Sequence, residues 1–259
     1  MTPRIAGRLA LVTGASSGIG EAIARRLADD GANLVLWARR EERLARLAEE
    51  IAARSRVTVD TGVVDIRDPE AVRGEAERLI AARGAPDILV NNAGLASGMA
   101  LVHNADVADW DRMIDTNVKG LLYVTRAFLH AMVERDSGQV VNIGSITGRQ
   151  VYPGGSVYAA TKYAVQAITE GTNLDVLGTG VRVSGVHPGL VETEFSLVRF
   201  KGDEDRARAV YEGVEPLTGA DVADVVSYVV NAPPQVNLAD VVVFGKSQGS
   251  VHHFHRAGE

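Results

Sequence analysis

Short apolar runs alternate with amphipathic stretches along the whole of this sequence. The apolar runs are typical of buried strands, and strands separated by helices indicate a parallel sheet with helices on both faces. Right-handed crossovers then predict a single doubly wound α/β sheet of the Rossmann type. We place its strands at 8–14, 33–38, 57–65, 87–91, 139–144, 181–186 and 236–244.

The stretches between these runs predict helices, and one of them opens with Pro69, a residue favoured in the first helical turn. No linker or repeat interrupts residues 1–259, so we expect one domain. The alternation breaks at 188–213, which is charged at 201–205. We interpret this segment as a flap over the carboxyl ends of the strands, with a solvated surface excursion as the alternative. The other helices are expected at 19–30, 41–53, 106–134, 156–177 and 219–230.

Composition excludes several classes of protein. The chain contains no cysteine, which rules out disulfide scaffolds, thiol catalysis and cysteine-ligated metals. Its net charge of −6 argues against nucleic-acid binding. No apolar run approaches the ~18 residues needed to span a membrane, and the first residues do not resemble a secretory signal. We therefore expect a cytoplasmic protein that binds neither membranes nor nucleic acid.

A glycine-rich loop at 13–20 lies between the first predicted strand and helix. Gly14 permits a tight turn, Gly18 lets the backbone approach a pyrophosphate, and Gly20 allows the helix to pack closely on the sheet. The helix N-terminus then favours the anion. The loop predicts a dinucleotide site that also includes Ser16, Ser17 and Ile19, and the alternative is a purely structural turn.

The end of the second strand selects the coenzyme. An NAD site carries an acidic residue there, whereas this chain has Arg39 and Arg40. Guanidinium groups suit a 2′-phosphate, so we predict NADP, with Arg39 as the main contact, Arg40 as the second and Ser16 as a further candidate. Alternatively, Arg40 is the solvated start of the next helix.

Tyr158 and Lys162 lie four residues apart, on one face of a predicted helix. A nearby cation and a position in the first helical turn both favour the phenolate. With Ser156 as the expected N-cap, Tyr158 would lie in that turn. We therefore expect a lowered tyrosine pKa, suited to a general acid–base group near neutral pH.

Ser145 follows the fifth predicted strand, at the carboxyl edge of the sheet where ligands bind in this architecture. Its hydroxyl can donate to a substrate oxygen on which charge develops. A lone serine after a strand is usually a turn residue, so this assignment depends on Tyr158 beginning the next helix.

Taken together, these motifs resemble the short-chain dehydrogenase/reductase family. The resemblance implies that Tyr158 is the acid–base group, that Ser145 orients the substrate oxygen, and that Asn117 holds a water in a proton relay. It also implies that Lys162 binds the nicotinamide ribose and lowers the tyrosine pKa. The matching stretches are 13–20, Asp65, 91–94, Asn117, Ser145, 158–162 and 188–189.

The same resemblance extends the coenzyme site. It implies that Asp65 contacts the adenine, that Asn92 lines the groove and that residues 188–193 cover the nicotinamide. Tyr158 and Lys162 would also touch the coenzyme. Within the covering segment the expected contacts are Pro188, Gly189, Val191 and Thr193.

The stretches 91–99, 109–117, 152–158 and 193–200 resemble the NADP-dependent 3-hydroxy acid dehydrogenases, a branch that includes serine and allo-threonine dehydrogenases. This implies a small hydroxy acid substrate, touched by Ser145 and Tyr158. Arg149 stands where the branch carries a small residue, so it is a candidate for the substrate carboxylate, with solvent as the alternative. Arg199 and Lys201 are rival candidates.

Two further readings of the chain remain open. It fits a ketone or aldehyde reductase of another substrate class, and less well a non-catalytic NADP-binding sensor. The family resemblance implies a homotetramer, or a dimer, paired through the long helices between the fourth and sixth strands. We interpret the histidines at 252, 253 and 255 as a solvated tail and expect no metal.

Overall fold

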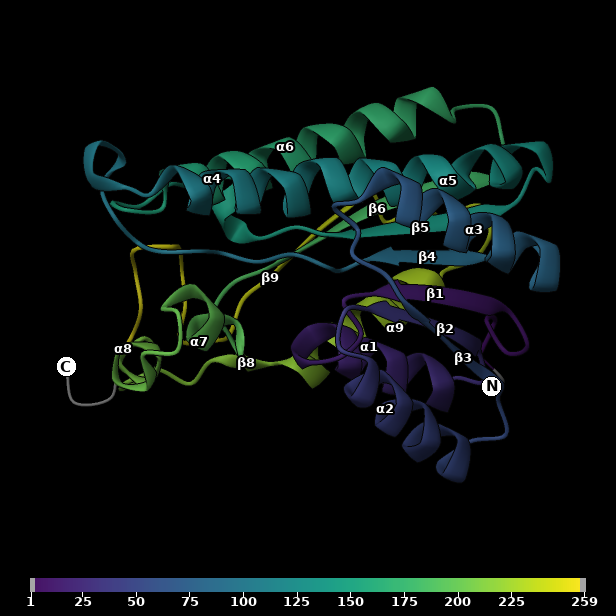
Figure 1. Cartoon of the computed structure of the whole chain (residues 1–259), viewed down its shortest axis with the longest axis horizontal. Coiled ribbons are helices and arrows are strands. Elements are labelled where there is room, and N and C mark those ends of the chain that lie inside the picture. Colours follow the sequence, from purple (N-terminus) through teal and green to yellow (C-terminus); the bar gives the residue numbers. More distant parts are fainter. Residues whose placement is uncertain (1–2, 257–259) are drawn as a thin grey trace.

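The computed structural model describes residues 3–256 and contains one parallel sheet of seven strands (Figure 1). Every pairing in this sheet is parallel, and the strand order is β3-β2-β1-β4-β5-β6-β9. The predicted doubly wound fold is confirmed. The strands are β1 Leu9–Thr13, β2 Asn33–Ala38, β3 Val59–Val63, β4 Ile88–Asn91, β5 Gly138–Ile143, β6 Val181–Pro188 and β9 Asp240–Val243.

Helices cover both faces of the sheet (Figure 1). On one face lie α1 Gly18–Asp29, α2 Glu41–Arg54 and α9 Gly219–Val230. On the other lie α3 Pro69–Arg83, α4 Val107–Ile114, α5 Leu121–Glu134 and α6 Ser156–Asp175.

The core has two layers, one on each face of the sheet, because successive side chains of each strand point to opposite faces. In β2, Leu34 and Leu36 face α1, α2 and α9, whereas Val35 and Trp37 face the opposite helices. Successive strand side chains point to opposite faces, so a fully apolar strand supplies both layers. Trp37 packs against Phe128 of α5, with ring centroids 5.6 Å apart.

The predicted helix at 106–134 is divided in the structure. A π-helical segment, Asp115–Gly120, joins α4 to α5. Such segments widen the helix locally and often occur at functional sites. The last strand is also shorter than expected, because only residues 240–243 of the predicted 236–244 pair with β6.

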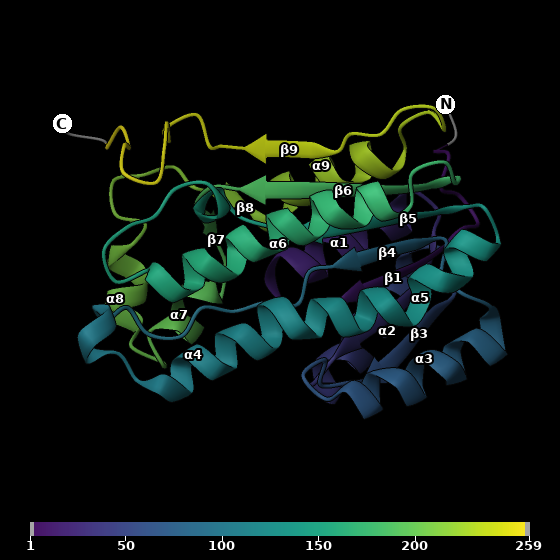
Figure 2. The same cartoon turned by 90° about the horizontal axis from the view of Figure 1, so that it is seen from above.

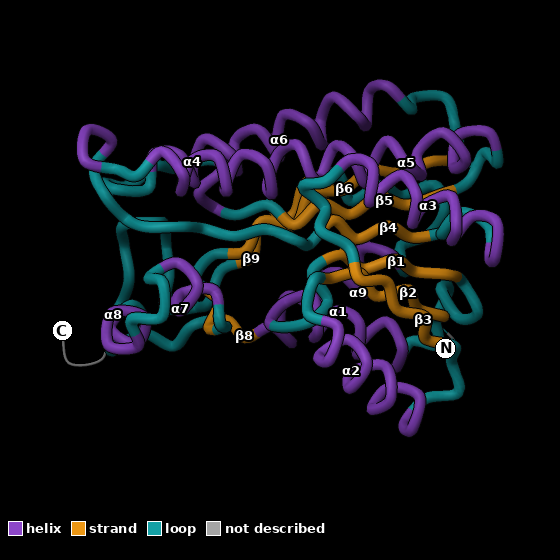
Figure 3. Tube along the Cα trace, in the orientation of Figure 1, coloured by secondary structure: helices purple, strands orange, loops and turns teal. Residues whose placement is uncertain are grey.

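Short elements project beyond the carboxyl ends of the strands (Figures 2 and 3). The segment 188–213 contains β7 Val191–Glu192, α7 Phe195–Arg199 and α8 Glu204–Ala209. β7 pairs with β8, Leu217–Thr218. Two 3₁₀ turns, Val102–Asn104 and Ile146–Gly148, lie in other loops. Among residues 3–256, no helix combines the length and apolar character needed to cross a membrane.

Candidate active site

A cavity of about 780 Å³ opens at the carboxyl ends of the strands. The strand order reverses between β1 and β4, and ligands of doubly wound sheets bind at such points. Four of the candidates named from the sequence, Gly20, Asn117, Arg149 and Lys201, do not line this cavity. Those that line it are Gly14, Ser16, Ser17, Gly18, Ile19, Arg39, Arg40, Asp65, Asn92, Ser145, Tyr158, Lys162, Pro188, Gly189, Val191, Thr193 and Arg199.

The glycine loop packs too closely against its neighbours to accept a side chain at Gly14 or Gly20. Gly14 and Gly18 adopt φ of +66° and +57°, a region that disfavours other residues. A Cβ on Gly14 would lie 2.8 Å from the Ala93 Cα, and one on Gly20 would lie 2.5 Å from the Gly14 carbonyl oxygen. Ser17 precedes α1 without a side-chain cap, so its hydroxyl leaves the first N–H groups of α1 uncapped, and the first residues of that helix, Gly18 and Ile19, line the cavity. This cradle fits a pyrophosphate.

Two arginines lie at the end of β2, as expected. Arg39 is exposed and lines the cavity. Arg40 is held against the glycine loop, because it donates to Ser16 Oγ at 3.1 Å and to Ser17 Oγ at 2.5 Å. The arrangement fits a 2′-phosphate beside the loop.

Asp65 and Asn92 complete this end of the cavity. Arg67 hydrogen-bonds to Asp65 and, with a smaller contribution from the charge of Arg39, holds the pKa of that carboxyl below its usual range. Asn92 donates to the Thr13 carbonyl oxygen at 2.9 Å and so ties the end of β4 to β1.

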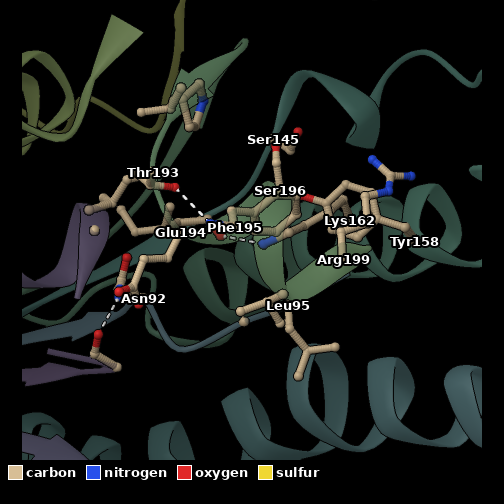
Figure 4. A pocket seen from close by; sticks show the side chains of 18 of the residues that line it. Asn92, Leu95, Ser145, Tyr158, Lys162, Thr193, Glu194, Phe195, Ser196 and Arg199 are labelled. Carbon is tan, nitrogen blue, oxygen red and sulfur yellow. Dashed lines mark hydrogen bonds between the residues drawn. The ribbon is translucent and has the colours of Figure 1, made fainter. Parts of the chain in front are cut away.

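Three reactive side chains meet at the other end of the cavity (Figure 4). Ser145 follows β5, and Tyr158 lies in the first turn of α6. Lys162, one turn later, donates to the Ile143 carbonyl oxygen at 2.9 Å. Gly155, rather than Ser156, is the N-cap of α6, and Ser156 is its first helical residue. A phenol, a hydroxyl and an ammonium group on one wall can exchange a proton with an alcohol or carbonyl oxygen.

Asn117 lies just behind this wall, in the π-helical segment. Its amide donates to the Leu95 carbonyl oxygen at 2.8 Å and to Thr161 Oγ1 at 3.0 Å, and its oxygen accepts from Leu95 N–H at 2.9 Å. A Cβ on Gly94 would lie 3.2 Å from Asn117 Oδ1 and 3.6 Å from Lys162 Nζ. Asn117 therefore fixes the loop after β4 beside the lysine.

The electrostatics of Tyr158 differ from our expectation of a lowered pKa. Burial raises the pKa of Tyr158 to about 12, and the hydrogen bond with Ser145 and the charge of Arg199 oppose this rise only in part. Burial also lowers the pKa of Lys162 to about 8. The sequence shows that Tyr158 and Lys162 are four residues apart, but it does not show that both side chains are buried. Burial disfavours the phenolate and the ammonium alike, because it removes water from both charged forms.

The segment 188–213, which the sequence predicts to be a flap, supplies the cation of Arg199 to the reactive end of the cavity. Arg199 lies over the rings of Tyr152 and Tyr158, 5.2 Å and 5.7 Å from their centroids, and donates to Tyr152 Oη. Lys201 instead pairs with Asp109 at 3.0 Å.

Arg149 does not lie in the cavity, although the sequence made it a candidate to bind the substrate carboxylate. Its guanidinium pairs with Asp240 of β9, which also lies 3.1 Å from Nε2 of His187. The side chain therefore faces the edge of the sheet rather than the cavity.

Several lining residues are not among the candidates named from the sequence. Tyr152 and Phe195 lie within stretches that carry the family resemblance but have no predicted role, whereas Gln248 and Phe254 come from the C-terminal segment, where no motif points to the site. The Gln248 side chain accepts from Leu190 N–H at 2.7 Å, a contact between residues 58 positions apart. Only tertiary folding brings such residues to the site.

Comparison with known proteins places the chain among oxidoreductases. Residues 8–203 match the family model described as short chain dehydrogenase. Sulfoacetaldehyde reductase 2 of Chromohalobacter salexigens is 47% identical over 231 residues, covering 89% of this chain and 91% of that protein. The NADP-dependent 3-hydroxy acid dehydrogenase YdfG of Escherichia coli K12 is 45% identical, covering 89% and 92%.

A solved structure shows the same fold. The closed form of serine dehydrogenase complexed with NADP⁺ superposes with a TM-score of 0.89, at 43% sequence identity, covering 96% of this chain and 99% of that one.

Proposed function

The chain belongs to the short chain dehydrogenase family, and from this premise we propose that it transfers a hydride between NADP(H) and a small 3-hydroxy acid or β-hydroxy amino acid. The products of oxidation are the corresponding carbonyl compounds. The observation that carries the substrate class is the Arg199 guanidinium, which lies beside Tyr158 where the carboxylate of such a substrate would pair with it.

The coenzyme assignment is supported by the cavity itself. The glycine cradle and the uncapped start of α1 would hold the pyrophosphate, and Arg39 and Arg40 would hold the 2′-phosphate. Asp65 would contact the adenine, and the segment 188–193 would cover the nicotinamide. When bound, NADP(H) accepts or donates the hydride at C4 of the nicotinamide.

The proton chemistry belongs to the chain's own residues. In oxidation, Tyr158 Oη takes the hydroxyl proton of the substrate while Ser145 holds the same oxygen by a hydrogen bond. In reduction, neutral Tyr158 returns the proton to the carbonyl oxygen. Lys162 would bind the nicotinamide ribose, and Asn117 would hold a water in a proton relay.

A second candidate is the reduction of a sulfonated aldehyde. Arg199 suits a sulfonate as well as a carboxylate, because both present several acceptor oxygens to a planar guanidinium. The 47% identical relative is named for such an activity.

A substrate panel tests the proposal. Coenzyme absorbance is followed with L-serine, L-allo-threonine, 3-hydroxypropionate, 3-hydroxyisobutyrate, sulfoacetaldehyde and uncharged ketones. We expect turnover of the hydroxy acids and a KM that rises at least about tenfold in Arg199→Gln, since charged hydrogen bonds contribute ~1.5–3 kcal/mol. Activity confined to uncharged ketones contradicts the proposal, and activity confined to sulfoacetaldehyde favours the second candidate.

We also propose that the enzyme is a cytoplasmic homotetramer, with a dimer as the alternative. Apolar side chains that are exposed in one chain support assembly, among them Ile114, Leu122, Leu174 and Tyr228 on α4, α5, α6 and α9. Light scattering on the purified protein is expected to give a mass four times that of one chain. The mass of a single chain contradicts assembly.

A further inference from the structure

Three charged side chains connect the flap to the corner between β2 and α2. Glu194 of the flap accepts from Arg40 at 3.0 Å and from Arg43 at 2.8 and 2.9 Å. Hydrogen bonds from Arg43 and Arg40 hold the pKa of Glu194 below its usual range. We refer to Glu194, Arg40 and Arg43 as the Glu194 cluster.

This cluster lies where the flap rests on the glycine loop. Arg40 donates to Ser16 and Ser17 of that loop as well as to Glu194. Thr193 packs on the same loop, because a Cβ on Gly18 would lie 3.3 Å from the Thr193 Cβ. Residues 193–194 of the flap therefore contact the coenzyme end of the cavity.

The helix that follows Glu194 reaches the opposite end of the cavity (Figure 4). Glu194 is the N-cap of α7, and its carbonyl oxygen accepts from Val198 N–H at 3.0 Å. Phe195, the first residue of α7, packs on Tyr158 with ring centroids 5.6 Å apart. Arg199, the last, lies over the same ring. One short helix thus joins the Glu194 cluster to the substrate wall.

We propose that Glu194 is a positioning residue for the hydride-transfer reaction, because its ion pairs with Arg40 and Arg43 hold α7 over both the coenzyme and the substrate. The proposal rests on the proposed function for its substrate readout. Arg40 serves both the 2′-phosphate end and the flap, so binding at the two ends of the cavity is coupled through one carboxylate.

Arg43 makes the inference testable without altering the proposed coenzyme contacts. It lies inside α2, and its guanidinium pairs with Glu194. If Arg43 acts through Glu194, Arg43→Gln reproduces part of the effect of Glu194→Gln, because the pair with Arg40 remains, and the double variant is no worse than Glu194→Gln alone. Asp205→Asn is the matched control, since it removes an exposed ion pair with Arg208 in the neighbouring helix α8.

Steady-state kinetics provide the first readout. Exposed ion pairs are individually weak, so we expect the hydroxy acid KM to rise roughly three- to tenfold in Glu194→Gln, with kcat within about twofold. Arg43→Gln is expected to raise this KM by a smaller factor, because it leaves the pair between Arg40 and Glu194, and Asp205→Asn is expected to match the unaltered enzyme. An unchanged KM in Glu194→Gln, or additive effects in the double variant, overturns the proposal.

Coenzyme release provides a second readout that does not depend on the substrate. Stopped-flow fluorescence is expected to show NADPH leaving Glu194→Gln about threefold or more faster, with a similar factor for NADH. An effect confined to NADPH assigns Glu194 to the 2′-phosphate alone and overturns the positioning role, as does slower or unchanged release. If the panel shows only uncharged ketones as substrates, the proposed function fails while this measurement still decides the role of Glu194.

Discussion

At the scale of single residues, the burial of one phenol controls the proposed proton transfer. Tyr158 is enclosed by Ser145, Phe195 and Arg199, and its pKa of about 12 leaves it neutral over the physiological range. A neutral phenol can donate in the reductive direction, whereas oxidation requires the phenolate. We therefore expect oxidation to accelerate as the pH rises and reduction to be favoured near neutrality.

Removing that phenol gives the most direct check. Tyr158→Phe keeps the ring that packs on Phe195 and removes the transferable proton. We expect kcat to fall by about 10²–10⁴-fold while NADPH binding, measured by fluorescence, stays within a few-fold. Retained turnover would mean that another group acts as the acid–base.

Arg199 is expected to shift the pH profile as well as to bind substrate. Its positive charge lowers the Tyr158 pKa, so Arg199→Gln moves that pKa further up. The rise of kcat for oxidation with pH should then shift to higher pH by roughly 0.5–1 unit. Saturating substrate isolates this effect from weaker binding, and an unshifted rise would contradict it.

Arg39 is expected to determine the choice of coenzyme. Arg39→Asp places a carboxylate where a 2′-phosphate would lie, so we expect kcat/KM with NADP⁺ to fall roughly 10–100-fold and that with NAD⁺ to change far less. Arg73→Asp, on the exposed face of α3, is the control. Equal losses with both coenzymes would refute the assignment of Arg39.

At the scale of elements, the sequence predicts which residues follow the strands, but it does not predict which contacts the loops make with distant parts of the chain. Gly14, Ser145 and Asn92 each follow an apolar run, and all carboxyl ends of a parallel sheet lie at one edge. Helix α7 spans only residues 195–199, too short for helical periodicity to show. The contacts of its N-cap Glu194 with Arg40 and Arg43, and of its last residue Arg199 with Tyr152, depend on tertiary folding.

We expect that a methyl group added at Gly20, where α1 packs against the end of β1, destabilises the protein. Gly20→Ala would force a Cβ against the Gly14 carbonyl oxygen, so we expect a lowered melting temperature and lost NADPH binding. Gly74→Ala in α3 is the matched control, because nothing lies within 4 Å of its Cβ. Helix propensity should make that variant more stable by about 0.5–1 kcal/mol. Equal melting temperatures for the two variants would contradict this reading.

At the scale of the whole molecule, every strand of the main sheet runs in the same direction. The carboxyl ends of the strands therefore all lie at the edge with the cavity, and their amino ends lie at the opposite edge. The loops that enter the strands lie at the rim opposite the cavity, for example at 176–180, where Leu177 is 82% exposed. Such a loop can carry a peptide tag or a fluorescent domain without approaching the coenzyme groove. We therefore expect that a tag inserted in the loop 176–180 leaves the steady-state turnover of the enzyme unchanged.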